Sequence, residues 1–225
     1  MNFIQIVNHV ILVRDVPRNV DELGEHIGHP HLRQLLEQFI YEQQNQNVVI
    51  GENIPPVEPL TGKVYLYPSA VATYYAPSDL SGIGGMHREI IRASSSWHGG
   101  HPRYDCVVVE HDAAQEGFKG LYVARIFCFL SVKHHETVLP CALVQWFSQV
   151  DTKPCQDTGM WIVKPDSNHP TSVIHLDCIL RGVHLIGVVG NDFLPTWFTC
   201  HDSLEAFQSF FVNKFSDNHA HEILF

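Results

Sequence analysis

The sequence has few basic residues for its size. Its 225 residues include 14 lysines and arginines against 24 aspartates and glutamates, so the formal net charge at pH 7 is −10. Binding along a nucleic-acid backbone requires several Lys or Arg side chains that neutralise phosphates. The composition therefore excludes nucleic-acid binding over the whole surface and leaves it only to a local basic stretch.

Closely spaced cysteines are also missing. The six cysteines are scattered, so the close Cys pairs of zinc ribbons and redox motifs are absent. No Asn-x-Ser/Thr glycosylation sequon occurs either. These absences predict an intracellular, reducing environment. Four thiols lie inside apolar runs and are expected to be free and buried like small hydrophobic residues: Cys106, Cys128, Cys141 and Cys178.

Long apolar segments and catalytic motifs are absent as well. No apolar run is long enough to span a bilayer. The N-terminal stretch MNFIQIVNHVILVR lacks the basic start of a signal peptide and is expected to form a strand. The patterns GxSxG, HExxH and CxxC do not occur. The sequence thus predicts a non-enzymatic protein with no cofactor, no bound metal and no membrane contact.

Two helices are predicted near the N-terminus. Asn19 is placed to cap a short helix, and Pro30 to start a second one. The Pro-rich stretch 51–62 then marks a boundary between an N-terminal helical segment, residues 1–60, and a β-rich domain, residues 61–225. The second helix has an apolar stripe that packs on its own core or on a partner: Leu32, Leu35, Leu36, Phe39 and Ile40.

A β module forms the centre of the second part. Four runs rich in β-branched and aromatic residues follow one another between polar clusters: GLYVARIFCFLSV, LPCALVQWFSQV, DTGMWIVKP and TSVIHLDCILRGVHLIGVVG. The shorter strands KVYLYPSA and ATYYAPS precede them. The predicted fold class is α+β, with a mostly antiparallel, barrel-like module. A C-terminal helix beginning at Asp202 or Ser203 is expected to pack on it through four apolar side chains: Leu204, Phe207, Phe210 and Phe211.

Residues 86–103 form a basic window in this acidic chain. Three arginines, Arg88, Arg92 and Arg103, stand against a single carboxylate there. A glycine-rich turn precedes the window without the Gly-Lys-Ser/Thr ending of a P-loop, and MHREIIRAS is expected to form a short helix. The arginines either bind phosphate or an acidic partner or pair with the protein's own carboxylates. Nucleic acid is expected to bind only through this window.

Three aromatic residues of the β module are candidates for a cage around a cationic side chain such as methyl-lysine. They are Tyr122, Trp146 and Trp161. Tryptophan in a strand is usually buried, so the alternative is that all three belong to the core. Together with the three arginines they make up the predicted binding residues.

Several sequence blocks follow one another in order over most of the chain: ATYYAPSDLSGIGGMHREIIRA, WHGGHPRYDCVVVE, PCALVQWFS, DTGMWIVKPD and SVIHLDCILRGVHLIGVVGNDFLP. In this order they resemble the C-terminal region of proteins encoded by Plavaka-type DNA transposons of mushroom-forming fungi. The family pattern ends in His-His-Ala-Phe-Glu, from which Asn218 and His221 depart here. The resemblance implies a transposon-derived protein.

A smaller set of blocks, VARI, CALVQWF and SVIHLDCILRGVHLI, is similar to a bromo-adjacent homology (BAH) module. Such modules are β-rich and read chromatin. The resemblance implies a BAH-like core at about residues 104–200, a protein or histone-tail partner, and a nuclear location.

Three functions compete on these patterns. The first is a non-catalytic interaction domain of a transposon-derived protein that binds protein or chromatin. The second is a metal-dependent nuclease or transposase remnant with Asp105 and Asp177 at strand ends, although the alternating parallel strand and helix pattern is missing. The third is a single-stranded nucleic-acid binder that uses the basic window. His98 and His101 have a metal-binding spacing but no evident third ligand, so no metal site is predicted.

Overall fold

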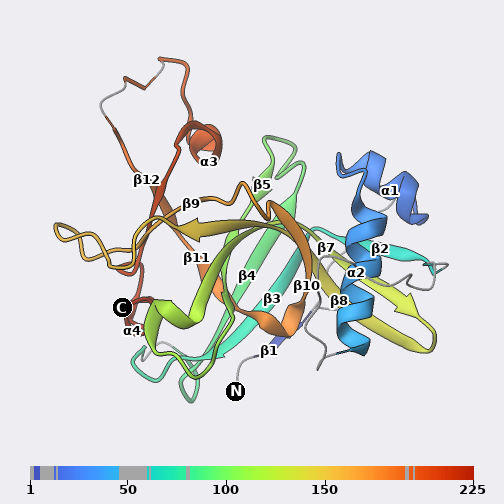
Figure 1. The fold of residues 1–225 in the computed structure, drawn as a ribbon, viewed down its shortest axis with the longest axis horizontal. Coiled ribbons are helices and arrows are strands. Elements are labelled where there is room, and N and C mark those ends of the chain that lie inside the picture. The colour runs from blue at the N-terminus through green and yellow to red at the C-terminus, as the bar shows by residue number, and fades with distance from the viewer. Residues whose placement is uncertain are drawn as a thin grey trace.

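The computed structural model describes residues 3–5, 13, 15–45, 60, 62–79, 82–190, 193–194 and 196–225. The predicted α+β class is confirmed: short helices surround antiparallel sheets (Figure 1). Most of the expected N-terminal strand lies outside the described residues, and only Phe3–Gln5 are seen as strand β1. Most of the Pro-rich stretch 51–62 also lies outside them.

A long hairpin forms the centre of the larger sheet. Its strands β7 and β8 turn at His135, which has a positive φ of 51°. Each strand is long enough for two neighbours: β6 and β2 pair with β7, while β9 and β10 pair with β8. The strands of this sheet are β2 (Val64–Tyr67), β6 (Cys106–Glu110), β7 (Leu121–His134), β8 (Thr137–Gln149), β9 (Ile162–Pro165), β10 (Thr171–His175), β11 (Ile179–Val183), β12 (Leu185–Gly187) and β13 (Phe210–Val212).

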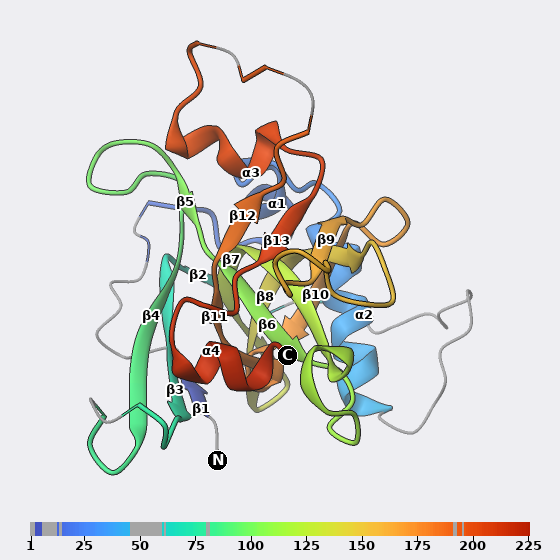
Figure 2. The same ribbon diagram turned by 90° about the vertical axis from the view of Figure 1, so that its left-hand side faces the viewer.

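A smaller sheet packs across one face of the larger one (Figure 2). Alanines and β-branched residues from both sheets form a shared core, which gives the β module its barrel-like interior. In the smaller sheet, Gly84 and Gly85 make the turn between the two long strands. Their φ values of 61° and 76° are in a region that favours glycine. Its strands are β1, β3 (Ser69–Tyr75), β4 (Met86–Ser94) and β5 (Arg103–Tyr104).

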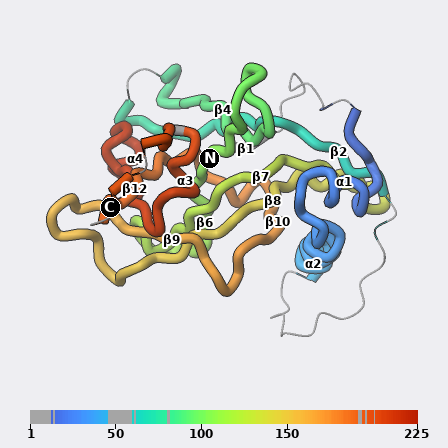
Figure 3. The backbone as a smooth tube through the Cα atoms, turned by 90° about the horizontal axis from the view of Figure 1, so that it is seen from above, coloured from blue at the N-terminus to red at the C-terminus, as the bar shows by residue number. Residues whose placement is uncertain are grey.

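The two N-terminal helices, α1 (Val20–His26) and α2 (Leu32–Gln44), pack on the opposite face of the larger sheet (Figure 3). The predicted cap is confirmed, because Asn19 Oδ1 accepts hydrogen bonds from the backbone N–H of Asp21 at 2.9 Å and of Glu22 at 3.4 Å. Most of the α2 apolar stripe is buried against β7, β8 and β10. The stripe therefore packs on the protein's own core.

The expected short helix at MHREIIRAS is wrong, because these residues form strand β4. The segment pairs with β3 over its whole length, from Tyr75 opposite Met86 to Ser69 opposite Arg92. Its burial alternates in the way a strand requires: Ile91 and Ala93 are buried, whereas the intervening positions are more exposed. Backbone pairing in the sheet thus outweighs the helix preference of these side chains.

The C-terminal segment also differs from the expectation of one helix over Leu204–Phe211. Helix α3 (Ser203–Ala206) is a single turn, and the chain then enters the larger sheet as β13. A second short helix, α4 (Asn218–Ile223), packs near the C-terminus through Ala220. The phenylalanines that suggested a helical stripe instead fill a sheet core, where Phe210 packs edge-on against Phe147.

The cysteines follow the prediction with one exception. Cys106, Cys128 and Cys141 are free and buried, and burial raises their thiol pKa values, to about 12 for Cys106 and Cys128. Cys178 is free but exposed, because it follows Leu176 and Asp177 in a 3-10 turn at the surface. Among the described helices, none is long and apolar enough to cross a membrane.

Candidate functional site

Two adjoining cavities form a groove beside strand β5 and helix α3. The first, called the arginine pocket, has a volume of about 400 Å³, and the second, called the carboxylate pocket, about 410 Å³. Arg103, Tyr104, Ser203 and Leu204 line both cavities, so these four residues form a wall that the two cavities share. The remaining residues of the arginine pocket are Trp97, Gly100, His101, Pro102, Arg125 and His201. The charged residues of the carboxylate pocket, besides Arg103, are Glu89, Asp105, Arg181 and Asp217.

One wall of the arginine pocket is built on Trp97. The guanidinium groups of Arg92 and Arg103 lie 4.6 and 5.5 Å from the centre of its ring. Asp105 ties the two arginines together: it accepts a 2.8 Å hydrogen bond from Arg103 Nε and a 2.9 Å bond from the backbone N–H of Arg92. The loop between β4 and β5 is thereby held against the sheet.

Arg125 forms the floor of the arginine pocket. It projects from β7, its side chain is 12% exposed, and its guanidinium carbon lies 5.4 Å from the ring centre of Tyr104 and 5.8 Å from that of Phe127. Its Nη1 pairs with the carboxylate of Glu205, a side chain that is 69% exposed on α3. Its Nε is buried and has no hydrogen-bond partner within the described part of the chain.

Two histidines stand at the mouth of this pocket. The rings of His101 and His201 stack with centres 4.1 Å apart and planes at 18°. His201 belongs to a 3-10 turn, Cys200–Asp202, which is closed by a capping box between Thr199 and Asp202. The Thr199 hydroxyl and backbone N–H hold the pKa of Asp202 below its usual value, with smaller contributions from the two histidines. This rim can donate N–H groups toward the pocket.

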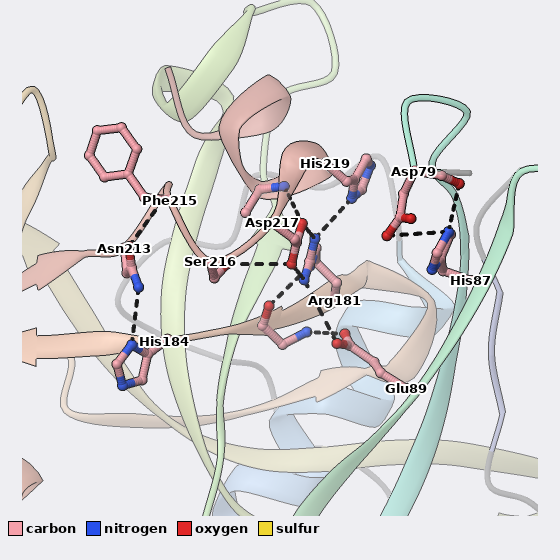
Figure 4. Close-up of polar contacts among 12 residues, drawn as sticks. Asp79, His87, Glu89, Arg181, His184, Asn213, Phe215, Ser216, Asp217 and His219 are labelled. Carbon is pink, nitrogen blue, oxygen red and sulfur yellow. Dashed lines mark hydrogen bonds and ion pairs between the residues drawn. The ribbon is translucent and has the colours of Figure 1, made fainter. Parts of the chain in front are cut away.

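The carboxylate pocket is organised around the buried Arg181 (Figure 4). Its guanidinium makes two parallel hydrogen bonds to Asp217, of 2.8 and 2.6 Å. It also lies 3.2 Å from His219 Nδ1 and 3.9 Å from a Glu89 oxygen. The Tyr74 ring packs 4.8 Å from the guanidinium carbon and stacks on His219. The network therefore joins β4 of the small sheet, β11 of the large sheet and the start of α4.

Burial and pairing shift the ionisation of this network in opposite directions. The Arg181 hydrogen bonds lower the pKa of Asp217 to about 2. Burial raises the pKa of Glu89, although the Gly182 N–H and Arg181 oppose the rise. Burial and the nearby Arg181 charge lower the pKa of His219, and burial raises that of Tyr74 to about 12. At neutral pH the network is expected to contain neutral His219 and a charged Arg181–Asp217 pair.

The structure brings some of the predicted arginines together. Arg92 and Arg103 meet on Trp97, as described above. Arg88 is exposed on β4, opposite Thr73, and does not line either pocket. Arg103 thus pairs with the protein's own Asp105, as one interpretation of the basic window expects. It also lines an open cavity, where the other interpretation places a phosphate or an acidic partner.

The predicted aromatic residues fall into two places. Tyr122 and Trp146 are in edge-to-face contact with ring centres 5.9 Å apart, and Trp146 Nε1 donates a 2.6 Å hydrogen bond to the Ser172 hydroxyl. Trp161 is only 3% exposed, stacks on Phe118 and donates to the backbone oxygen of Phe225. Trp161 is therefore enclosed in a core cluster apart from the other two.

The carboxylates considered for a nuclease are far from ideal metal ligands. Both oxygens of Asp105 are already engaged by Arg92 and Arg103. Asp177 is 75% exposed, and one of its oxygens lies 3.4 Å from His175 Nδ1. Within the described ranges, no group of three His, Cys, Asp or Glu side chains is arranged to hold a metal ion.

Among the residues that sequence reasoning missed are the two ion pairs beside the groove, Arg125–Glu205 and Arg181–Asp217. A usable signal existed for the two arginines, because each is a lone charge in an otherwise apolar strand, in LYVARIFCF and in CILRGV. A charge in such a position requires a partner or a function. The two carboxylates carry no comparable signal, because acidic side chains in polar stretches are common in this acidic chain.

Comparison with known proteins identifies no relative, so the proposed function rests on the geometry of the site and on the sequence patterns. No family model matches the chain, and no curated protein sequence is significantly similar to it.

Proposed function

We propose that the chain is a non-catalytic interaction domain that binds a segment of a protein partner in the groove. The observation that carries the proposal is the convergence of Arg103 and Arg125 on one open cavity in a chain whose net charge is −10. Arg, Trp and Tyr are enriched among the residues that carry most of the binding energy at the centres of protein interfaces. Here they surround a cavity of about 400 Å³ with Trp97 and Tyr104.

Chromatin is the proposed source of the partner. This part of the proposal is supported by the BAH-like order of strand sequences and by the transposon resemblance, which together favour a nuclear role. The net charge of −10 adds long-range attraction for basic proteins such as histones. The groove then provides the local contacts that select one segment among them.

The proposal is tested with purified histone octamers and the whole chain as bait. Binding is expected for the wild type and is expected to be lost in Arg103→Glu even though the chain becomes more acidic, because the change removes the guanidinium donors from the wall shared by both pockets. Arg18→Glu is the matched control: this exposed arginine lies over Tyr65 beside the helices and does not line the groove. Equal capture by the three proteins would refute the groove as the binding site.

Single-stranded nucleic acid is the alternative outcome of the same experiment. Trp97, flanked by Arg92 and Arg103, offers a ring and cations of the kind that bind unpaired bases. A labelled oligonucleotide titrated at about 50 and about 200 mM salt separates the two, because an affinity that rests on three arginine–phosphate contacts falls by roughly 10- to 20-fold over that range. Oligonucleotide binding that is steeply salt dependent, together with no octamer capture, would reject the protein partner.

A further inference from the structure

We infer that the arginine pocket binds a carboxylate or phosphate group on a side chain of the partner, and that Glu205 occupies this position in the free chain. The inference rests on the proposed function and adds the chemistry of the ligand. It follows from how incompletely the guanidinium groups of this pocket are used.

Arg125 has spare hydrogen-bonding capacity in a place where water is largely excluded. A guanidinium has five N–H donors in a fixed fork that matches two oxygens of a carboxylate or phosphate. Here the fork is used by one contact, from Nη1 to a single Glu205 oxygen. The Nε is buried without a partner in the described part of the chain. The site therefore lacks the second oxygen that an arginine in this environment normally has.

Arg103 contributes further donors to the same cavity. Its Nε is engaged by Asp105, but its two terminal nitrogens form no hydrogen bond within the described residues. Its side chain is partly exposed and lines the pocket together with His101 and His201. An oxyanion placed in the pocket would thus meet donors from Arg103, Arg125 and the histidine rim. The residues that line the pocket include no carboxylate, so Glu205, which reaches Arg125 from α3, and Asp105, which pairs with Arg103, are the acidic groups beside these arginines.

Glu205 has the properties of a displaceable occupant. It belongs to a helix of four residues, Ser203–Ala206, in which no residue is buried. Its side chain is 69% exposed, so solvent screens its attraction to Arg125. An anion that reaches Arg125 with two oxygens gains the paired, charge-assisted hydrogen bonds that the single Glu205 contact does not provide. Binding of the ligand would then release Glu205 to solvent.

The pocket favours a group on a protein side chain because the groove continues beyond it. The arginine pocket and the carboxylate pocket share Tyr104 and Leu204 among their lining residues, so a ligand anchored at Arg125 can extend over this shared wall. The carboxylates of Glu89 and Asp217 at that end lie against Arg181. A segment that places an anionic side chain at Arg125 and polar backbone along the shared wall fits both pockets.

The test measures binding of short synthetic peptides to the whole chain by isothermal titration calorimetry. The peptides share one sequence and carry phosphoserine, Glu, Ser or Lys at a central position, and inorganic phosphate is titrated separately. We expect the phosphoserine and Glu peptides to bind and the Ser and Lys peptides not to. The preference between phosphoserine and Glu identifies which anion the site takes. Binding of inorganic phosphate without any preference among the peptides would overturn the inference.

The decisive variants act in opposite directions on the same affinity. Glu205→Gln removes the competing charge and is expected to tighten binding of the anionic peptide by about fivefold, the size of an exposed ion pair. Arg125→Lys keeps the charge but removes the fork, and is expected to weaken binding by at least about tenfold. Arg18→Gln is the control and should leave the affinity unchanged. If Glu205→Gln weakens binding or leaves it unaltered, Glu205 is not a competitor and the inference is wrong.

The experiment distinguishes a loss of folding from a loss of binding in each variant. Thermal unfolding of each variant is followed first, and if Arg125→Lys does not fold, Glu205→Gln and Arg103→Gln still decide the outcome through their opposite expected effects. If histone capture depends on Arg103 but Glu205→Gln does not tighten anion binding, the inference fails and the proposed function stands. If the anionic peptides bind as expected and histones are not captured, the anion site stands and the chromatin partner is rejected.

Discussion

Arg125 and Arg181 are both largely buried arginines on strands of the same sheet, yet their surroundings differ. Arg181 holds Asp217 with two short hydrogen bonds, lies near Glu89 and packs on Tyr74. Arg125 has a single exposed carboxylate and a buried Nε without a partner in the described chain. The guanidinium of Arg181 is thus held on several sides by the protein's own groups, whereas Arg125 keeps a donor that no described residue engages. This difference supports a structural role for Arg181 and the proposed binding role for Arg125.

The largest effect is expected from Arg181→Gln. The change leaves Asp217 and Glu89 without their buried cation, and removing one partner of a buried ion pair costs about 3–5 kcal/mol of unfolding free energy. Urea unfolding at neutral pH measures the loss directly. A loss below about 1 kcal/mol, the range of exposed pairs, would show that Arg181 is no more structural than a surface arginine.

A second prediction concerns acid. Because the folded-state pKa of Asp217 is about 2 and its ordinary value is 3.8, its pairing stabilises the fold fully above about pH 4, and this stability is lost as the pH falls through 2. Glu89 has a raised pKa, so the fold gains from its protonation as the pH falls and part of the loss is masked. We expect Asp217→Asn to be less stable at pH 6 by about 1–2 kcal/mol, reduced from the full linkage value because the side chain is 32% exposed.

The measurement for Asp217 is urea unfolding at several pH values between 2 and 6. The wild type should lose stability toward pH 2, and Asp217→Asn should lose less over the same range. Glu89→Gln is the matched control, because it removes the protonation of Glu89 that offsets part of the loss. Below pH 5 this variant should therefore lose stability more steeply than the wild type. Parallel pH profiles for the wild type and Asp217→Asn would contradict the assignment of acid sensitivity to this pair.

Local sequence patterns were sufficient for most elements of the fold. The strand-forming runs around VARIFCFL and CALVQWFS, and the cap at Asn19, depend on neighbours within a few residues, and the structure confirms them. The errors arose where pairing with another strand decided the outcome, either the preceding strand or one distant in the sequence. MHREIIRAS became a strand because β3 pairs with it, and the stretch around Phe210 became a strand because β9 and β12 flank it.

The groove was predictable only in part, for the same reason. Arg92 and Arg103 stand near Asp105 in the sequence, and their cluster follows from a local charge count. The Arg125–Glu205 and Arg181–Asp217 pairs join residues 80 and 36 positions apart. Such pairings depend on how the sheet and the C-terminal segment pack together, which residue spacing does not encode. The lone arginines inside apolar strands indicated that partners exist but did not identify them.

A smaller effect is expected at Arg125's own partner. Glu205→Gln should change the unfolding free energy by less than about 1 kcal/mol, because the carboxylate is mostly exposed and screened by solvent. Urea unfolding beside the Arg181→Gln variant gives the contrast between the two arginines in one experiment. A loss of about 3 kcal/mol or more in Glu205→Gln would place Arg125 and Glu205 in the same structural class as Arg181 and Asp217.

The smallest effect is expected from Arg88→Glu. This side chain is exposed on β4, opposite Thr73, and lines neither pocket. The unfolding free energy should change by no more than about 0.5 kcal/mol, the usual range for surface substitutions, and the affinity for the anionic peptide should stay the same. If the basic window instead acts through long-range charge, reversing Arg88 weakens binding as strongly as reversing Arg103, and both losses vanish at high salt. A loss restricted to Arg103 that persists at high salt assigns binding to direct contacts inside the arginine pocket.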